Sequence, residues 1–142
     1  MAFAATGGTL VSSGVRYASR IFATAGIFNI VVGAVTFLAP LTAAELLGAA
    51  PPESTLFVKL AGWLVLVLGV GYGLTALHPE RNRDLMLIGG IGKLLVLPLM
   101  ISAWRRGDVG FAGVTAGAGD FVLALLFFDV LRRMSGARTY EG

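Results

Sequence analysis

The sequence predicts an all-α polytopic membrane protein, in which four transmembrane helices form an antiparallel bundle and a short interfacial helix lies between the first two. Of the 142 residues, 56% are hydrophobic and only 13% are charged, whereas about 25% of the residues of a soluble domain are charged. The apolar residues gather in runs of about 20, the length that crosses a hydrocarbon core of about 30 Å. Basic residues stand at the ends of these runs, as membrane anchors do.

The first span is predicted at about residues 21–39, where an apolar run is ended by Pro40. Residues 1–15 are mostly small and polar, and no basic segment stands ahead of an apolar core. This pattern is typical of a flexible N-terminal tail and not of a signal peptide.

A short connection and the second span come next. Residues 42–47 predict a short amphipathic helix at the membrane interface, ended by Gly48. The second span, at about residues 56–77, begins behind a Ser54 cap. Lys59 lies one turn inside this span, from where its long side chain reaches the interface.

The third span is predicted at about residues 85–104, with Asp84 as its N-cap, and the fourth at about residues 111–131. The four spans together define a transmembrane domain at residues 16–133. They leave residues 134–142 as a polar C-terminal tail.

The distribution of basic residues predicts the topology. An even number of spans puts both termini on one side of the membrane. That side carries seven basic residues, and the other side carries two between the third and fourth spans. The positive-inside rule then predicts a multi-pass protein of the inner (plasma) membrane with both termini in the cytoplasm. The residues predicted to anchor the helices at the interfaces are Lys59, Trp104, Tyr17 and Arg132.

Two formal charges lie inside predicted spans, Lys93 in the third and Asp120 in the fourth. A charge near the middle of a bilayer costs roughly 2.5–3.5 kcal/mol on insertion scales. Each therefore needs a partner, a water-filled cavity or a shifted protonation equilibrium. The two residues are candidates to be each other's partner.

Other polar residues share helix faces with small residues, which is where neighbouring helices pack. Asn29 stands with Gly33, and Asp120 with Gly113 and Gly117, so we expect these faces to point into the bundle. At ~1.5 Å per residue from the predicted cytoplasmic ends, Lys93 lies ~12 Å deep, Asn29 ~13 Å, Asp120 ~16 Å and Tyr72 ~8 Å. The sequence thus predicts one buried polar cluster of Lys93, Asp120, Asn29 and Tyr72.

The cluster has two interpretations. A lysine–aspartate pair can fix helix register as a structural ion pair, or it can serve a ligand or an ion. Asn29 can likewise join helices or contact a ligand, and Tyr72 can simply pack beside glycine. A purely structural pair does not require Asn29 and Tyr72 at nearly the same depth, so this surplus polarity is the feature that separates the two interpretations.

Several function classes are disfavoured. The chain has no cysteine and one histidine, His78, so we expect no thiol chemistry and no metal site. No nucleophilic triad, carboxylate dyad or phosphate-binding loop is present, which argues against an enzyme. No basic, aromatic-interleaved surface remains outside the spans, which argues against nucleic-acid binding.

Five short motifs resemble the pattern of small bacterial four-span membrane proteins similar to the DoxX-like group. The motifs are Asn29-x-x-x-Gly33, Gly69-x-Gly71-Tyr72, His78-Pro79-x-Arg81-Asn82-Arg83, Gly89-x-x-Gly92-Lys93 and Gly119-Asp120, and the resemblance covers roughly residues 20–133. The resemblance implies a four-helix bundle. Some proteins of this group are linked to quinone-coupled sulfur oxidation, but no redox-active residue or cofactor ligand of this chain matches.

Two functional hypotheses follow. The first is a non-catalytic membrane subunit or accessory protein, which docks with a larger membrane complex or forms a homo-oligomer. The second is a binding or transport module that holds a lipid, a quinone or an ion at the Lys93 and Asp120 cluster. Membrane lipids are partners in both, and no resident cofactor is expected.

Overall fold

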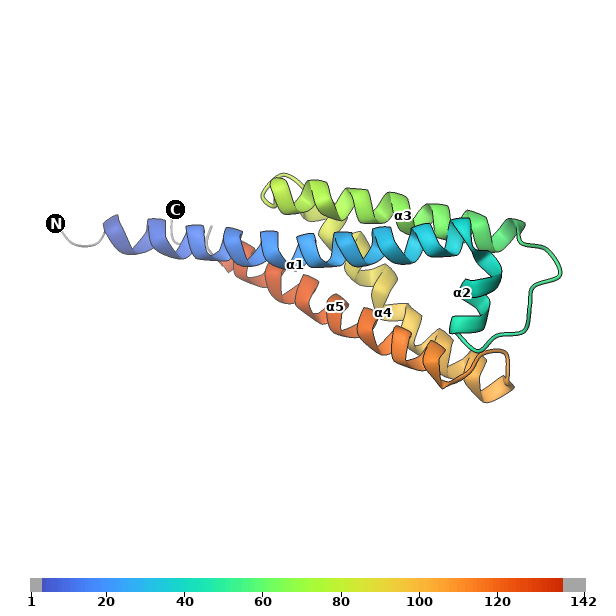
Figure 1. Cartoon of the computed structure of the whole chain (residues 1–142). Coiled ribbons are helices and arrows are strands. Elements are labelled where there is room, and N and C mark those ends of the chain that lie inside the picture. The colour runs from blue at the N-terminus through green and yellow to red at the C-terminus, as the bar shows by residue number, and fades with distance from the viewer. Residues whose placement is uncertain (1–3, 137–142) are drawn as a thin grey trace.

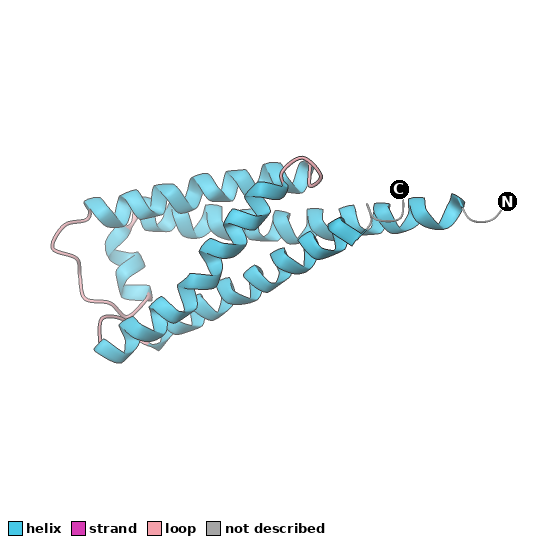
Figure 2. Cartoon of the chain, turned by 180° about the vertical axis from the view of Figure 1, so that it is seen from behind, coloured by secondary structure: helices cyan, strands magenta, loops and turns pink. Residues whose placement is uncertain are grey.

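The structure is a computed structural model that describes residues 4–136. It is all-α, as the sequence predicts. The helices are α1 (Ala4–Leu38), α2 (Pro40–Leu46), α3 (Leu56–Leu77), α4 (Arg83–Arg106) and α5 (Phe111–Gly136) (Figure 1). Every described residue outside them lies in a turn or loop (Figure 2).

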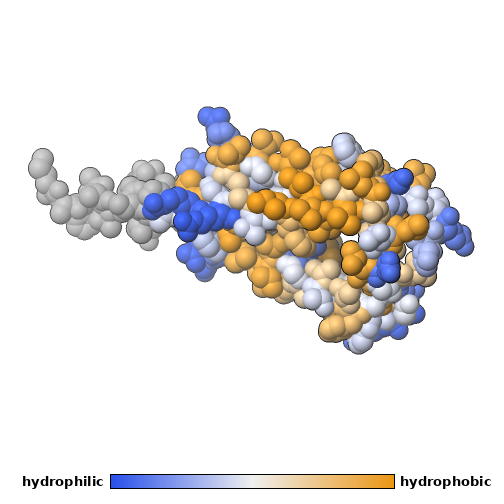
Figure 3. Space-filling view, in the orientation of Figure 1, coloured by the Kyte–Doolittle hydropathy of each residue, from blue (hydrophilic) through white to orange (hydrophobic). Residues whose placement is uncertain are grey.

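Four of these helices are long and apolar enough to cross a membrane, in the segments Ser13–Leu38, Leu56–Leu77, Arg83–Arg106 and Phe111–Ser135. They indicate a multi-pass membrane protein. Figure 3 shows the corresponding surface, a broad apolar band between two ends at which hydrophilic residues gather. Many large apolar side chains of this band are exposed, as lipid-facing side chains are.

Most of the segment predicted as an N-terminal tail, residues 1–15, is helical, because α1 begins at Ala4. No proline interrupts this segment, and extending a helix costs less than nucleating a new one. Residues 1–3 lie outside the described part of the chain. At the other end, α5 continues to Gly136, so only the remainder of the predicted C-terminal tail lies outside the described residues.

Two predicted helix caps need correction. Asp84 was expected at the N-cap of the third span, but α4 begins one residue earlier at Arg83, with Asn82 at the N-cap. Asp84 lies instead in the first turn, where a carboxylate favours the positive end of the helix dipole. The N-cap of α3 is Thr55, although the Ser54 hydroxyl does accept a hydrogen bond from the Leu56 amide at 3.3 Å.

Glycines bring α1 and α3 together along most of their length (Figure 1). A Cβ atom at Gly33 would lie 2.8 Å from the Gly62 carbonyl oxygen, and one at Gly62 would lie 2.6 Å from the Phe37 amide nitrogen. Further along, a Cβ atom at Gly26 would lie 3.0 Å from the Gly69 carbonyl oxygen. Only hydrogen fits between these backbones, which is the packing mode of small residues in membranes.

The second close pair is α4 with α5. A Cβ atom at Gly117 would lie 3.1 Å from the Leu97 Cα atom, and one at Gly113 would lie 3.5 Å from the Met100 sulfur. The prediction that Gly33, Gly113 and Gly117 face neighbouring helices is therefore confirmed.

The two helix pairs meet at the end where α1 begins and α5 ends, and they diverge toward α2 (Figures 1 and 2). At the joined end, the Phe22 and Phe127 rings stack with centroids 4.1 Å apart. The Tyr72 ring meets Phe127 edge-on at 5.1 Å. These aromatic residues belong to the buried core, together with Ala18, Ala25, Met86 and Val130.

The short helix α2 lies across the diverging end (Figure 1). It confirms the helix predicted at residues 42–47, and Gly48 follows it with φ +67, a left-handed conformation that glycine adopts freely. The Gly110 amide donates a hydrogen bond to the Leu47 carbonyl oxygen at 2.9 Å. This bond ties the end of α2 to the turn between α4 and α5.

We predict that Gly33→Ala lowers the free energy of unfolding by about 1–3 kcal/mol, because the added methyl group overpacks the contact between α1 and α3. The matched control is Gly73→Ala, since a Cβ atom there would meet nothing within 4 Å. Unfolding of the detergent-solubilised variants measures both. Equal losses in the two variants would contradict the close packing at Gly33.

Candidate functional site

The predicted charge pair is in contact. Lys93 lies on α4 and Asp120 on α5, and the Lys93 ammonium donates a hydrogen bond to Asp120 Oδ1 within an ion pair. The Lys93 side chain is only 8% exposed and that of Asp120 is 21% exposed. Gly117 lets α5 approach α4 closely one turn before Asp120, which sets the distance that the pair needs.

Asn29 joins the pair from α1. The Lys93 ammonium donates a second hydrogen bond to Asn29 Oδ1, at 3.0 Å, and Asn29 is 4% exposed. This bond links one helix pair to the other, because α1 packs with α3 and α4 packs with α5. We call Asn29, Lys93 and Asp120 the polar triad.

Aromatic rings cover the remaining side of the ammonium. Lys93 Nζ lies 5.8 Å from the centroid of the Tyr72 ring and 5.9 Å from that of the Phe28 ring, both within cation–π range. Tyr72 is therefore beside the triad, as predicted, but it meets Lys93 through its ring. Its hydroxyl end lies over Gly89, where a Cβ atom would clash with the ring.

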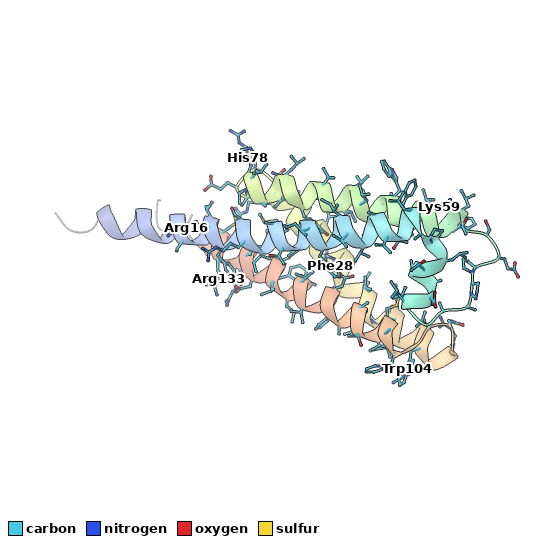
Figure 4. The ribbon with its side chains drawn as sticks, in the orientation of Figure 1. Arg16, Phe28, Lys59, His78, Trp104 and Arg133 are labelled. Atoms are coloured by element: carbon cyan, nitrogen blue, oxygen red, sulfur yellow. The ribbon has the colours of Figure 1, made fainter. Side chains whose placement is uncertain are left out.

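Phe28 was not predicted as a site residue. Phe28 directly precedes Asn29, but it is an apolar residue in an apolar span, so nothing in the sequence distinguishes it from a lipid-facing residue. Figure 4 shows Phe28 midway along the molecule, far from the labelled residues at its ends, Arg16, Arg133, Lys59 and Trp104. The triad and its aromatic cover thus lie well inside the membrane-spanning region.

The second carboxylate oxygen of Asp120 has a different environment from the first. Asp120 Oδ1 accepts the bond from Lys93, whereas Oδ2 accepts no hydrogen bond from the described residues. The side chain keeps 21% of its surface accessible. No buried side-chain nitrogen or oxygen of the described residues lacks a hydrogen-bond partner, so Oδ2 lies on the accessible part of the side chain, where a donor from outside the triad can reach it.

The predicted interfacial anchors lie at the two ends of the molecule, but two of them also make specific contacts. The Tyr17 hydroxyl donates a hydrogen bond to Asp129 Oδ2 at 3.3 Å, and Arg132 donates to Asp129 Oδ1 at 3.0 Å. Arg133 donates to Asp129 Oδ2 at 2.7 Å, and its guanidinium carbon lies 5.1 Å from the Tyr17 ring centroid. Asp129 thus accepts hydrogen bonds from three side chains on two helices, Tyr17 of α1 and Arg132 and Arg133 of α5.

At the opposite end, Lys59 and Trp104 are exposed on the surface (Figure 4). The Trp104 ring meets Phe111 with centroids 6.1 Å apart. An open pocket of about 370 Å³ also lies at this end, between α2 and the loop that follows it, and Leu41, Ala44, Glu45, Gly48, Ala49 and Pro51 line it. It contains no residue of the triad.

Among residues 4–136, no group of three or more histidine, cysteine or acidic side chains could hold a metal ion. Comparisons with protein-family models, with curated proteins and with solved structures find no match to this chain.

We predict a strong coupling between Lys93 and Asp120 in a double-mutant cycle. Lys93→Met leaves a buried carboxylate unpaired and Asp120→Asn leaves a buried ammonium unpaired, so each should lower the free energy of unfolding by about 3–5 kcal/mol. The double variant leaves neither charge and should recover much of the loss. The free energies of unfolding of the wild type, the two single variants and the double variant, measured in detergent, give the coupling energy.

The control for this cycle is the exposed pair Arg106 and Asp108, which are 61% and 55% exposed and lie 2.8 Å apart. Removing either charge there should change the stability by less than about 1 kcal/mol. Additive losses at Lys93 and Asp120 would show that their contact contributes no pairwise energy.

Proposed function

We propose that this chain is a non-catalytic binding module of the membrane, which holds a small ligand with a hydrogen-bond donor at the polar triad. The observation that carries this proposal is the accessible second oxygen of Asp120, which has no donor among the described residues. A ligand hydroxyl, an amine or a hydrated ion would complete its coordination.

The charge balance of the triad limits the ligand class. Lys93 and Asp120 neutralise each other, so the site as a whole adds no net charge to the membrane interior. A neutral polar headgroup then suits the site better than a strong anion or cation. The rings of Phe28 and Tyr72 beside the ammonium would favour a ligand whose polar group continues into apolar structure, such as a lipid or a quinol.

The second candidate function is a membrane subunit or accessory protein, with the triad serving only to hold the helices. The observation that favours it is that Lys93 and Asn29 are already paired with each other inside the bundle. Its partners would be a larger membrane complex or further copies of the chain, docked on the exposed apolar faces of the helices.

We further propose that the chain resides in the inner (plasma) membrane with both termini in the cytoplasm. The basis is the excess of arginine at the end where α1 begins and α5 ends. Membership of the DoxX-like group also remains a proposal, which the four-helix architecture supports only at the level of fold.

We predict that the protein purified in a mild detergent carries a small molecule, which native mass spectrometry detects as a defined mass increment. The Lys93→Met/Asp120→Asn double variant should lose this increment while remaining folded, because it lacks the carboxylate that accepts the ligand's hydrogen bond and the ammonium that orients that carboxylate. Asp108→Asn, which removes an exposed carboxylate, should keep it.

The same experiment separates the two functions. An increment of the mass of another protein, retained by the double variant, would support the accessory subunit. A wild-type protein without any defined small-molecule increment would contradict the binding module.

For the topology, we predict that an impermeant thiol reagent labels a cysteine at position 108 in intact cells and does not label cysteines at positions 13 and 135. The chain has no cysteine of its own, so Asp108→Cys, Ser13→Cys and Ser135→Cys each give a single site. The reverse labelling pattern would invert the proposed orientation.

A further inference from the structure

The two ends of the molecule differ in charge. Within the described residues, the end where α1 begins and α5 ends carries six arginines and three carboxylates, which are Arg16, Arg20, Arg81, Arg83, Arg132, Arg133, Glu80, Asp84 and Asp129. The α2 end carries three cations and three carboxylates, which are Lys59, Arg105, Arg106, Glu45, Glu53 and Asp108. One end is therefore basic and the other is balanced.

Side-chain contacts join the helices at the basic end. Arg83 Nη2 on α4 donates a hydrogen bond to the Ser135 hydroxyl on α5 at 2.7 Å. Tyr17 on α1 contacts Asp129 and Arg133 on α5. These contacts bring Arg83 of α4 and Arg133 of α5 to the same end of the molecule, and Figure 4 shows Arg16 and Arg133 there.

Among the described residues, only part of this positive charge is neutralised. Asp129 accepts hydrogen bonds from both Arg132 and Arg133, so a single carboxylate serves two guanidinium groups. Arg16, Arg20 and Arg81 are exposed and form no ion pair with a described carboxylate. Arg16 and Arg20 are four residues apart on α1, so they lie on the same face, one turn apart.

The depth of these arginines indicates the anion that they meet. Arg20 directly precedes the apolar run of α1, and Arg132 and Arg133 directly follow that of α5. Residues at the ends of apolar runs lie at the level of the lipid headgroups. Guanidinium groups bind phosphate oxygens through two parallel hydrogen bonds, which distinguishes them from simple point charges.

We infer that the basic end is a binding site for the phosphate of an anionic phospholipid, with Arg16 and Arg20 of α1 and Arg132 of α5 as its principal contacts. This inference is independent of the ligand proposed for the polar triad. The headgroup phosphate supplies the negative charge that Arg16 and Arg20 lack among the described residues. It also supplements Asp129, the single carboxylate that Arg132 shares with Arg133. The lipid chains extend along the apolar faces of the helices.

The test titrates the full-length protein in mixed micelles with phosphatidylglycerol or with phosphatidylcholine, and native mass spectrometry counts the bound lipid. We expect phosphatidylglycerol to bind at least tenfold more tightly than phosphatidylcholine. Arg16→Gln/Arg20→Gln should weaken phosphatidylglycerol binding roughly 30-fold, since one arginine near an anionic surface contributes roughly fivefold. Arg132→Gln should weaken phosphatidylglycerol binding roughly fivefold, the contribution of one arginine.

The matched control is Arg105→Gln/Arg106→Gln, which removes the same charge from the balanced end and should leave phosphatidylglycerol binding within about twofold of wild type. Equal losses in the two double variants, or no loss in Arg16→Gln/Arg20→Gln, would overturn the inference. If the Arg16→Gln/Arg20→Gln variant does not fold, Arg132→Gln tests the inference instead, because it replaces a single exposed side chain. Unchanged phosphatidylglycerol binding in Arg132→Gln would then overturn the inference. Inorganic phosphate that competes as strongly as the lipid would also overturn it, in favour of a free-anion site.

Discussion

The ion pair between Lys93 and Asp120 is the constraint on which the rest of the arrangement depends. A lone charge in the membrane interior is costly, so these two side chains have to meet, and they can meet only if α4 and α5 are close neighbours at one depth. Gly117 provides that closeness one turn away. Asn29 then fixes α1 against the pair, because its amide oxygen is the second acceptor for the Lys93 ammonium.

Close packing and polar contacts hold different parts of the bundle together. Glycine contacts hold α1 to α3 and α4 to α5, and these contacts are apolar and close. The two pairs are joined to each other differently, by the stacked rings of Phe22 and Phe127, by Asn29 with Lys93, and by Tyr17 with Asp129. Beyond the triad the pairs diverge, and α2 lies across the open end (Figure 1).

Polar and charged side chains gather in two regions of the molecule, the polar triad and the arginine-rich end. The polar triad is inside the membrane-spanning region, nearly neutral and largely closed, with one accessible carboxylate oxygen. The arginine-rich end lies where the apolar runs of α1 and α5 stop, and only some of its charge is neutralised among the described residues. The low dielectric around the polar triad makes it sensitive to a single hydrogen bond. At the arginine-rich end, solvent screens each charge, so several arginines must act together.

The sequence by itself determined the spans, because hydrophobic length and the scarcity of charge are local properties, and α3 begins and ends at the predicted residues, Leu56 and Leu77. It also determined which polar residues had to be buried, since Lys93, Asp120 and Asn29 lie inside those spans. Only the tertiary structure decided that these three side chains touch, that Tyr72 contributes its ring and that Phe28 completes the cover. Those contacts depend on which helices are neighbours and how each is rotated, and helical periodicity in one sequence does not specify either.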